Sequence, residues 1–158
     1  MRIREAEEAD VGLIAGLVRE LAEFERLLHE VRLTEAALRD ALFGERRYAE
    51  VAIAEDERGE PMGFALFFHT YSTFLGQPGI YLEDLFVRPE HRGAGVGTAL
   101  LRHLGRLAAE RGCGRLEWAV LDWNEAAIEF YRRLGARPTA DWTVYRLDGE
   151  ALARLAAG

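Results

Sequence analysis

The sequence contains no lysine, because all 20 residues counted as Lys plus Arg are arginine. This absence excludes a pyridoxal-phosphate enzyme, which forms a Schiff base with a lysine, and a Walker-type phosphate-binding loop, whose lysine contacts the β- and γ-phosphates. Basic residues are also outnumbered, since 27 Asp and Glu give a formal net charge of -7. This excess of acid argues against general binding to a nucleic-acid backbone and favours a small cationic partner.

Cysteine is scarce as well. Cys113 stands alone, so neither an intrachain disulfide nor a Cys-x-x-Cys metal site can form. The 4 histidines are scattered without metal-ligand spacing, so we expect no metal. Long apolar runs are missing too: Val11–Val18 is far shorter than a membrane span, and the first residues lack the apolar core of a signal peptide. We therefore expect a cytoplasmic protein with no membrane partner.

The 158 residues, of which 49% are hydrophobic and 30% charged, suit one domain covering residues 1–158. Apolar periodicity and glycine or proline breaks predict the order β-α-α-β-β-β-α-β-α-β, followed by a short terminal helix. This is an α/β fold with a mixed central sheet and flanking helices, in which the second to fourth strands form an antiparallel meander. The predicted strands cover 2–5, 48–55, 62–71, 80–88, 115–121 and 143–147, and the predicted helices 10–28, 34–41, 98–111 and 124–134.

A glycine-rich turn follows the strand 80–88 and opens the next helix. Its sequence is Arg92-Gly93-Ala94-Gly95-Val96-Gly97-Thr98, and we call it the glycine turn. Unsatisfied backbone N–H groups and the positive end of the helix dipole converge at such a place, and Arg92 adds a cation suited to a pyrophosphate. Three glycines can also form only a tight turn, so ligand binding stays open on this feature alone. A dinucleotide-binding fingerprint does not fit, because its third glycine would fall at Thr98.

The spacing Arg-x-x-Gly-x-Gly after Leu85-Phe86-Val87-Arg88-Pro89, together with the order of elements, resembles the GCN5-related N-acetyltransferase (GNAT) superfamily. Three further segments resemble its diamine acetyltransferases, and most of all the thialysine N-epsilon-acetyltransferase branch. They are Leu21-Ala22-Glu23-Phe24-Glu25, Tyr81-Leu82-Glu83-Asp84 and Val120-Leu121-Asp122-Trp123-Asn124. The resemblance implies the GNAT fold, acetyl transfer from acetyl-CoA to a small primary amine by direct attack in a ternary complex, and a homodimer.

The resemblance also implies which residues bind acetyl-CoA. In that family the glycine turn holds the pyrophosphate, the preceding strand holds the pantetheine, and the start of a later helix contacts the CoA arm. The matching residues are Leu85, Phe86, Val87, Arg92, Gly93, Ala94, Gly95, Val96, Gly97, Thr98, Asn124, Glu125, Ala126 and Ala127. Asn124 also suits a helix N-cap, and both roles are compatible. The N–H of Val87 is the expected donor to the oxyanion.

Two residues are candidates for proton transfer. A lysine-like amine has a pKa of about 10.4 and arrives protonated at neutral pH, so a base must act before it can attack a thioester. By resemblance, Glu83 is the base, acting through water, and Tyr131 is the acid that protonates the leaving thiolate. The residues alone leave open that Glu83 is simply solvated and that Tyr131 is a core aromatic.

Acceptor recognition needs carboxylates that face a cationic substrate. The candidates for acceptor binding are Phe24, Glu25, Ser72, Glu83, Asp84 and Asp122, and of these Phe24 and Glu25 are the pair that the resemblance implies. Phe24 and Glu25 could equally be an ordinary amphipathic helix end, and Asp122 could equally flank a helix. Ser72 stands where the polyamine-preferring branch has an acidic loop, which argues against strong spermidine binding.

Two other functions stay open. One is a GNAT enzyme that acts on a protein N-terminus or an antibiotic, which needs a wider acceptor groove. The other is a non-catalytic CoA-binding module, in which the turn binds CoA without chemistry. The presence of both Glu83 and Tyr131 argues against the module.

Overall fold

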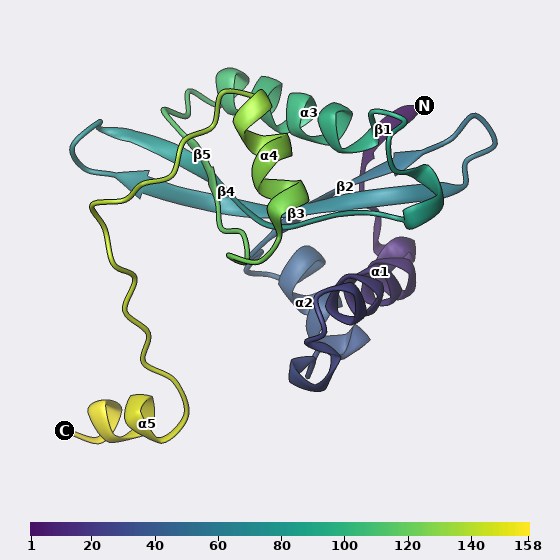
Figure 1. Cartoon of the computed structure of the whole chain (residues 1–158). Helices are drawn as coiled ribbons and strands as arrows, with labels where there is room; N and C mark the ends of the chain where they lie inside the picture. Colours follow the sequence, from purple (N-terminus) through teal and green to yellow (C-terminus); the bar gives the residue numbers. More distant parts are fainter. The chain divides into compact units, whose positions relative to one another are not determined.

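The computed structural model describes residues 1–158, which fall into two compact units, Met1–Ala119 and Val120–Gly158. The first unit holds strands β1 (Arg2–Glu5), β2 (Glu50–Glu55), β3 (Pro61–Ser72), β4 (Gln77–Val87) and β5 (Leu116–Trp118), and helices α1 (Val11–Phe24), α2 (Glu35–Phe43) and α3 (Val96–Glu110) (Figure 1). The second unit holds α4 (Glu125–Arg133) and α5 (Gly149–Ala157). Whether the whole chain forms one domain stays a prediction.

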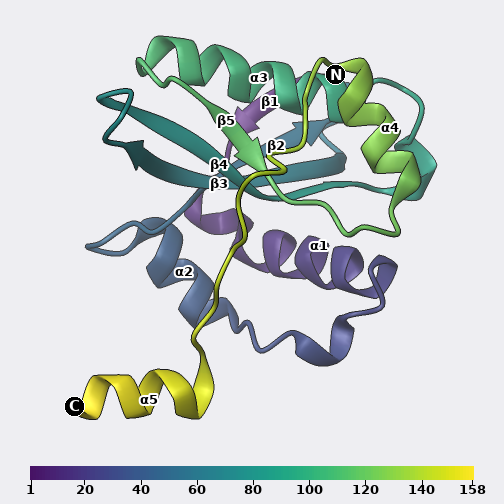
Figure 2. The ribbon, with the colours of Figure 1, turned by 60° about the vertical axis from the view of Figure 1, so that its left-hand side comes forward.

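The first unit is built on one five-stranded sheet in the order β1-β2-β3-β4-β5. Neighbouring strands from β1 to β4 are antiparallel, and β5 is parallel to β4. The predicted mixed sheet with an antiparallel meander is therefore confirmed. In Figure 2, α1 and α2 cover one face of this sheet and α3 covers the other.

The core follows from the alternation of side chains along the strands. Phe64 of β3 pairs with Phe86 of β4, and both pack against buried residues of α1 and α2, among them Leu17. On the other face, α3 contributes Leu100 and Leu104, which are fully buried. Two apolar layers thus hold β4 in place between the helices.

Helix α2 begins as predicted and extends to Phe43, two residues beyond the predicted end at Ala41, whereas α1 ends earlier than its apolar spacing indicates. Thr34 caps α2, because its Oγ1 accepts a hydrogen bond of 3.1 Å from the N–H of Ala37. Helical spacing in α1 continues to Leu28, but the helix ends at Phe24. Arg26 has a φ of 60°, a left-handed conformation that prevents the helix from continuing.

The predicted strand at 143–147 is wrong, since these residues form no strand. Val144 and Tyr145 are 91% and 92% exposed. A strand needs a neighbour to pair its backbone N–H and C=O groups, and the second unit contains no other strand. The predicted terminal helix is confirmed as α5.

The helices give no sign of a bilayer-crossing element, because none is both long enough and apolar enough to span a membrane. No group of three or more His, Cys, Asp or Glu side chains is arranged to hold a metal ion.

Candidate functional site

The glycine turn exposes its backbone at the start of α3. Gly93 and Gly95 have φ angles of 79° and 81°, which glycine adopts without steric strain. Gly95 is the N-cap of α3 and, as a glycine, has no side chain with which to cap the first N–H groups of that helix. Residues Arg92 to Gly95 are exposed. The turn therefore presents backbone donors at a helix N-terminus, an arrangement suited to a phosphate group.

Strand β4 carries a bulge at Glu83. Leu66 of β3 pairs with Asp84, whereas the next residue, Phe67, pairs with Leu82, so Glu83 is an extra residue without a partner on β3. The parallel ladder between β4 and β5 also stops here, because its last pair is Leu82 with Trp118. The bulge explains why β5 is shorter than the predicted strand 115–121, since a bulge disrupts the ladder. Beyond the bulge, β5 does not pair with β4.

Past the bulge, the edge of β4 that β5 leaves unpaired presents the backbone of Val87. The N–H of Arg88 donates to the carbonyl of Met62 on β3. Backbone direction alternates along a strand, so the N–H and C=O of Val87 point to the opposite edge. The Val87 carbonyl accepts a hydrogen bond of 2.9 Å from Nε of Arg92. The Val87 N–H therefore lies on the edge where the sequence predicts an oxyanion donor.

Three carboxylates, Glu25, Glu83 and Asp84, which we call the acidic trio, are related through Asp84, because Glu25 and Glu83 both lie close enough to act on it. Burial, with added repulsion from Glu83 and Glu25, raises the pKa of Asp84 to about 6. Burial also raises the pKa of Glu25. Because each ionised carboxylate opposes ionisation of its neighbour, a cation bound here would relieve the repulsion. The structure thus brings together three of the predicted acceptor-binding residues.

Two arginines that follow β4 contact the C-terminal end of α1. Arg88 donates to both carboxylate oxygens of Glu20, at 2.9 and 3.1 Å. Cζ of Arg92 lies 4.4 Å from the centre of the Phe24 ring and 5.7 Å from that of Phe86, in cation–π geometry. Sequence reasoning missed the role of Glu20, although its spacing of four residues from Phe24 places both on one face of α1.

Ser72 lies apart from the acidic trio. Its Oγ accepts a hydrogen bond of 3.2 Å from the N–H of Leu75, and its carbonyl accepts one of 2.8 Å from Gly76, so it closes the turn between β3 and β4. It sits six residues along β3 from Leu66, the partner of Asp84, or roughly 20 Å at about 3.3 Å per residue. Within one chain, Ser72 does not join the carboxylates, and its role in acceptor binding stays a prediction.

The second unit holds the remaining predicted residues. Asn124 is the N-cap of α4, as expected, because its Oδ1 accepts a hydrogen bond of 3.3 Å from the N–H of Ala127. Tyr131 is partly buried on α4, with its ring centre 5.4 Å from that of Phe130. Asp122 is exposed before the helix. The local structure of α4 thus matches the predicted helix, and the catalytic role of Tyr131 stays a prediction.

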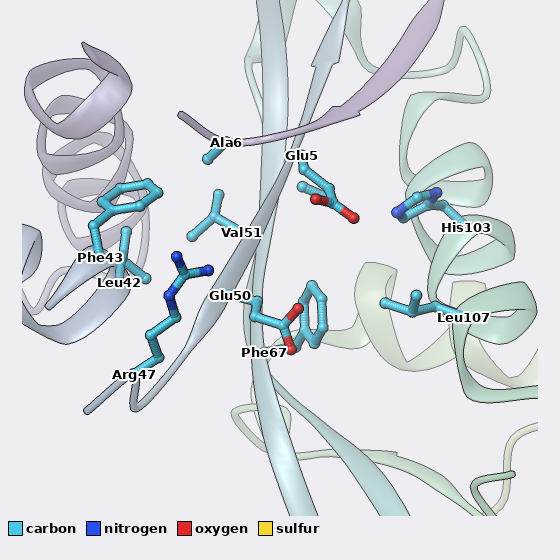
Figure 3. A pocket seen from close by; sticks show the side chains of 11 residues that line it. Glu5, Ala6, Leu42, Phe43, Arg47, Glu50, Val51, Phe67, His103 and Leu107 are labelled. Carbon is cyan, nitrogen blue, oxygen red and sulfur yellow. The ribbon is translucent and has the colours of Figure 1, made fainter. Parts of the chain in front are cut away.

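A separate hollow lies at the end of the sheet where β1 stops (Figure 3). Glu5, Arg47, Glu50 and His103 are among its lining residues. The hydrogen bonds from Arg111 lower the pKa of Glu50, and burial lowers the pKa of His103. None of the predicted site residues lines this hollow.

An α/β chain with a phosphate-type turn and carboxylates beside a bulged strand has the parts of a group-transfer enzyme. Residues 16–136 match the model of the acetyltransferase (GNAT) family, and the chain belongs to this family. It is an acetyltransferase.

The chain is also similar in sequence to individual acetyltransferases. The chain is 42% identical to thialysine N-epsilon-acetyltransferase of Bos taurus, an alignment that covers 98% of this chain and 96% of that protein. It is 33% identical to an L-ornithine N5-acetyltransferase of Arabidopsis thaliana, covering 96% of this chain and 86% of that protein.

Solved structures confirm the predicted GNAT fold. An integron cassette protein from the mobile metagenome of V. cholerae superposes with a TM-score of 0.82 at 26% identity, covering 99% of this chain and 98% of that one. An aminoglycoside acetyltransferase from an uncultured soil metagenomic sample gives a TM-score of 0.73 at 26% identity, covering 93% and 95%.

Proposed function

We propose that this protein transfers the acetyl group of acetyl-CoA to a primary amine of a small cationic substrate, such as thialysine, a lysine-like amino acid or a diamine. The observation that carries the proposal is the acidic trio, in which Glu25 and Glu83 add repulsion to the partly buried Asp84 that a cationic amine would relieve. The proposal is supported by the likeness to relatives named for acetylating thialysine and L-ornithine, which are small amines.

The residues of the first unit fit a CoA cosubstrate. The glycine turn offers exposed backbone donors for a pyrophosphate, and Arg92 adds a cation next to them. The edge of β4 from Leu85 to Val87 offers backbone groups to a pantetheine arm, as an added strand would use them. In the second unit, Asn124 to Ala127 are the proposed contacts to the CoA arm, by resemblance. The bound thioester supplies an electrophilic carbonyl and a thiolate leaving group.

We assign each proton transfer of the proposed reaction to a named group. Glu83 accepts a proton from the substrate ammonium through a water molecule, which frees the nitrogen lone pair. As the new C–N bond forms, the N–H of Val87 donates to the oxygen that gains negative charge. When the C–S bond breaks, Tyr131 donates its phenolic proton to the thiolate. The second proton that the amine nitrogen loses as the amide forms passes through water to the tyrosinate and restores the phenol. Glu25, Asp84 and Asp122 are the proposed partners for the substrate's other cationic group, and Phe24 lines the approach.

The test of the function is a panel of amines in which the release of free CoA thiol from acetyl-CoA is measured. We expect the release of thiol from acetyl-CoA to be at least about tenfold faster with thialysine, lysine, ornithine or putrescine than with spermidine. A tenfold ratio of rates corresponds to a difference of only about 1.4 kcal/mol in activation free energy. Release only with a peptide N-terminus or an aminoglycoside would identify the alternative enzyme functions. CoA binding with no release for any amine would leave the non-catalytic module as the better description.

Gly95→Ala is expected to weaken CoA binding by about 5- to 30-fold, because a left-handed alanine costs about 1–2 kcal/mol and the competent turn becomes less populated. The positive φ of Gly95 is the reason to choose this position. Calorimetric titration with CoA measures the effect. Gly105→Ala is the control, since a Cβ at that α3 position meets no atom within 4 Å. Unchanged affinity in Gly95→Ala would contradict a role for the turn geometry.

Three broader proposals accompany this function: the chain forms a single domain, assembles as a homodimer and resides in the cytoplasm. The family match over residues 16–136 spans parts of both compact units, which supports the single domain. Light scattering after size-exclusion chromatography measures the oligomeric state directly.

A further inference from the structure

The end of α1 is attached to the segment after β4 at two points. Glu20 accepts hydrogen bonds from Arg88, and one helical turn later Phe24 lies under the guanidinium of Arg92. The two α1 residues are four apart and the two arginines are four apart, so the contacts repeat along one face of the helix. Any group that fixes Arg92 therefore also restricts the end of α1.

Arg92 can hold Phe24 and a phosphate group together. A guanidinium stacks through its flat face, whereas its N–H donors point outward in its plane. Nε is used by the carbonyl of Val87, and the other two nitrogens carry further donors. Arg92 is exposed and directly precedes Gly93 and Gly95 of the turn. An anion on the turn and the ring of Phe24 thus engage different parts of one side chain.

Phe24 and Glu25 lie together at the end of α1, where the N–H of Glu25 donates to the carbonyl of Leu21. Phe24 is the last residue of α1 and Glu25 follows it directly, just before the left-handed Arg26 that ends the helical path. The charge of Glu25 contributes to the raised pKa of Asp84, so the two carboxylates are near each other. Movement of the end of α1 would therefore change the distance between Glu25 and Asp84.

We propose that Arg92, acting through Phe24, couples cofactor binding to acceptor binding. A pyrophosphate on the glycine turn fixes the guanidinium over the Phe24 ring, and the end of α1 then holds Glu25 in place for a cationic amine. Arg92 is a positioning residue for the acceptor in addition to its proposed contact with CoA. This inference rests on the proposed function, and by linkage the amine must tighten CoA binding by the same factor as CoA tightens amine binding.

The experiment measures the dissociation constant of CoA by calorimetry with and without saturating thialysine. CoA carries no acetyl group, so no turnover interferes. We expect thialysine to tighten CoA binding to the unaltered protein by about 5- to 50-fold. In Phe24→Leu, which removes the ring and keeps Arg92, this factor falls to less than about twofold, while CoA affinity without amine changes by less than about threefold. Phe24→Tyr keeps an aromatic face and restores the coupling.

Arg92→Lys provides a second variant, because it keeps the positive charge but loses the flat fork that stacks on the ring and donates in its plane. It is expected to lose the coupling as well, and thermal unfolding of every variant checks that it is folded. Equal coupling in Phe24→Leu and the unaltered protein overturns the inference, as does coupling absent from the unaltered protein. Failure of the function is a different result: no amine in the panel releases CoA thiol, whatever the binding constants are.

Discussion

Tyr131→Phe is expected to lower kcat by about 10²- to 10⁴-fold while the affinity for CoA changes by less than about twofold. A thiolate that leaves a thioester is stabilised by a proton, and a phenol is protonated at pH 7 and can donate it. The substitution removes only the hydroxyl and keeps the ring that lies beside Phe130 on α4. The loss should therefore appear in the chemical step rather than in cofactor binding.

The control for this variant is Tyr145→Phe, since Tyr145 is 92% exposed in the second unit and has no proposed role. Steady-state kinetics with thialysine and calorimetry with CoA separate kcat from binding, and thermal unfolding shows whether loss of the Tyr131 hydroxyl disturbs α4. Near-normal turnover in folded Tyr131→Phe would refute the assignment of Tyr131 as the acid. A loss of CoA affinity equal to the loss of kcat would instead identify a binding role.

Asp84→Asn is expected to lower kcat/KM for a dicationic amine by tenfold or more, yet to stabilise the fold at pH 8 by about 1–3 kcal/mol. Burial and two neighbouring carboxylates raise the pKa of Asp84 from 3.8 to about 6. The folded state therefore binds this proton more tightly than the unfolded chain does. Protonation of Asp84 therefore increases the free energy of unfolding as the pH falls from about 6 toward 3.8. Above pH 6 the ionised, partly buried carboxylate lowers the free energy of unfolding, and asparagine removes this destabilising charge.

Urea unfolding at pH 5 and pH 8 tests the stability change, with the exposed Asp141→Asn as the control that should change neither value. A variant Asp84→Asn that is less stable than the unaltered protein at pH 8 would contradict the electrostatic account. Activity gives an independent check. In the unaltered protein, kcat/KM should rise through about pH 6 as Asp84 ionises.

In Glu83→Gln, we expect the rise of kcat/KM with pH to occur at lower pH than in the unaltered protein. The reason is that removal of the Glu83 charge lowers the pKa of Asp84. If Glu83 is also the base, kcat falls at every pH. If the rise of kcat/KM occurs at the same pH and kcat is unchanged, Glu83 is neither the base nor the source of the repulsion on Asp84.

Features that depend on near neighbours in the chain were predictable. The hydroxyl of Thr34 and the amide of Asn124 reach N–H groups three residues away, so the sequence alone places these two caps. The glycine turn is local in the same sense, because a positive φ at Gly93 and Gly95 depends on the absence of a Cβ and not on distant contacts. The family resemblance, carried by short segments, is confirmed by the family match.

Other features were not predictable because they depend on residues far apart in sequence. The strand expected at 143–147 has strand-forming residues but forms no strand, since pairing and not propensity decides whether a strand exists. The bulge at Glu83 arises from the register between β3 and β4, and the sequence around Glu83 does not by itself indicate it. Ser72, predicted by resemblance, lies at the end of the paired strands β3 and β4, away from the bulge.

The sequence by itself determined the chemistry available to this protein: a phosphate-type turn, an acidic surplus suited to a cationic amine, and no lysine of its own. Tertiary structure alone decided which of these groups act on one another. Phe24 and Arg92 are 68 residues apart in the chain, as are Glu20 and Arg88, and they meet only because α1 packs on the face of the sheet that carries Phe86. Burial on that face is also what raises the pKa of Asp84, a property that no neighbour in sequence could impose by itself.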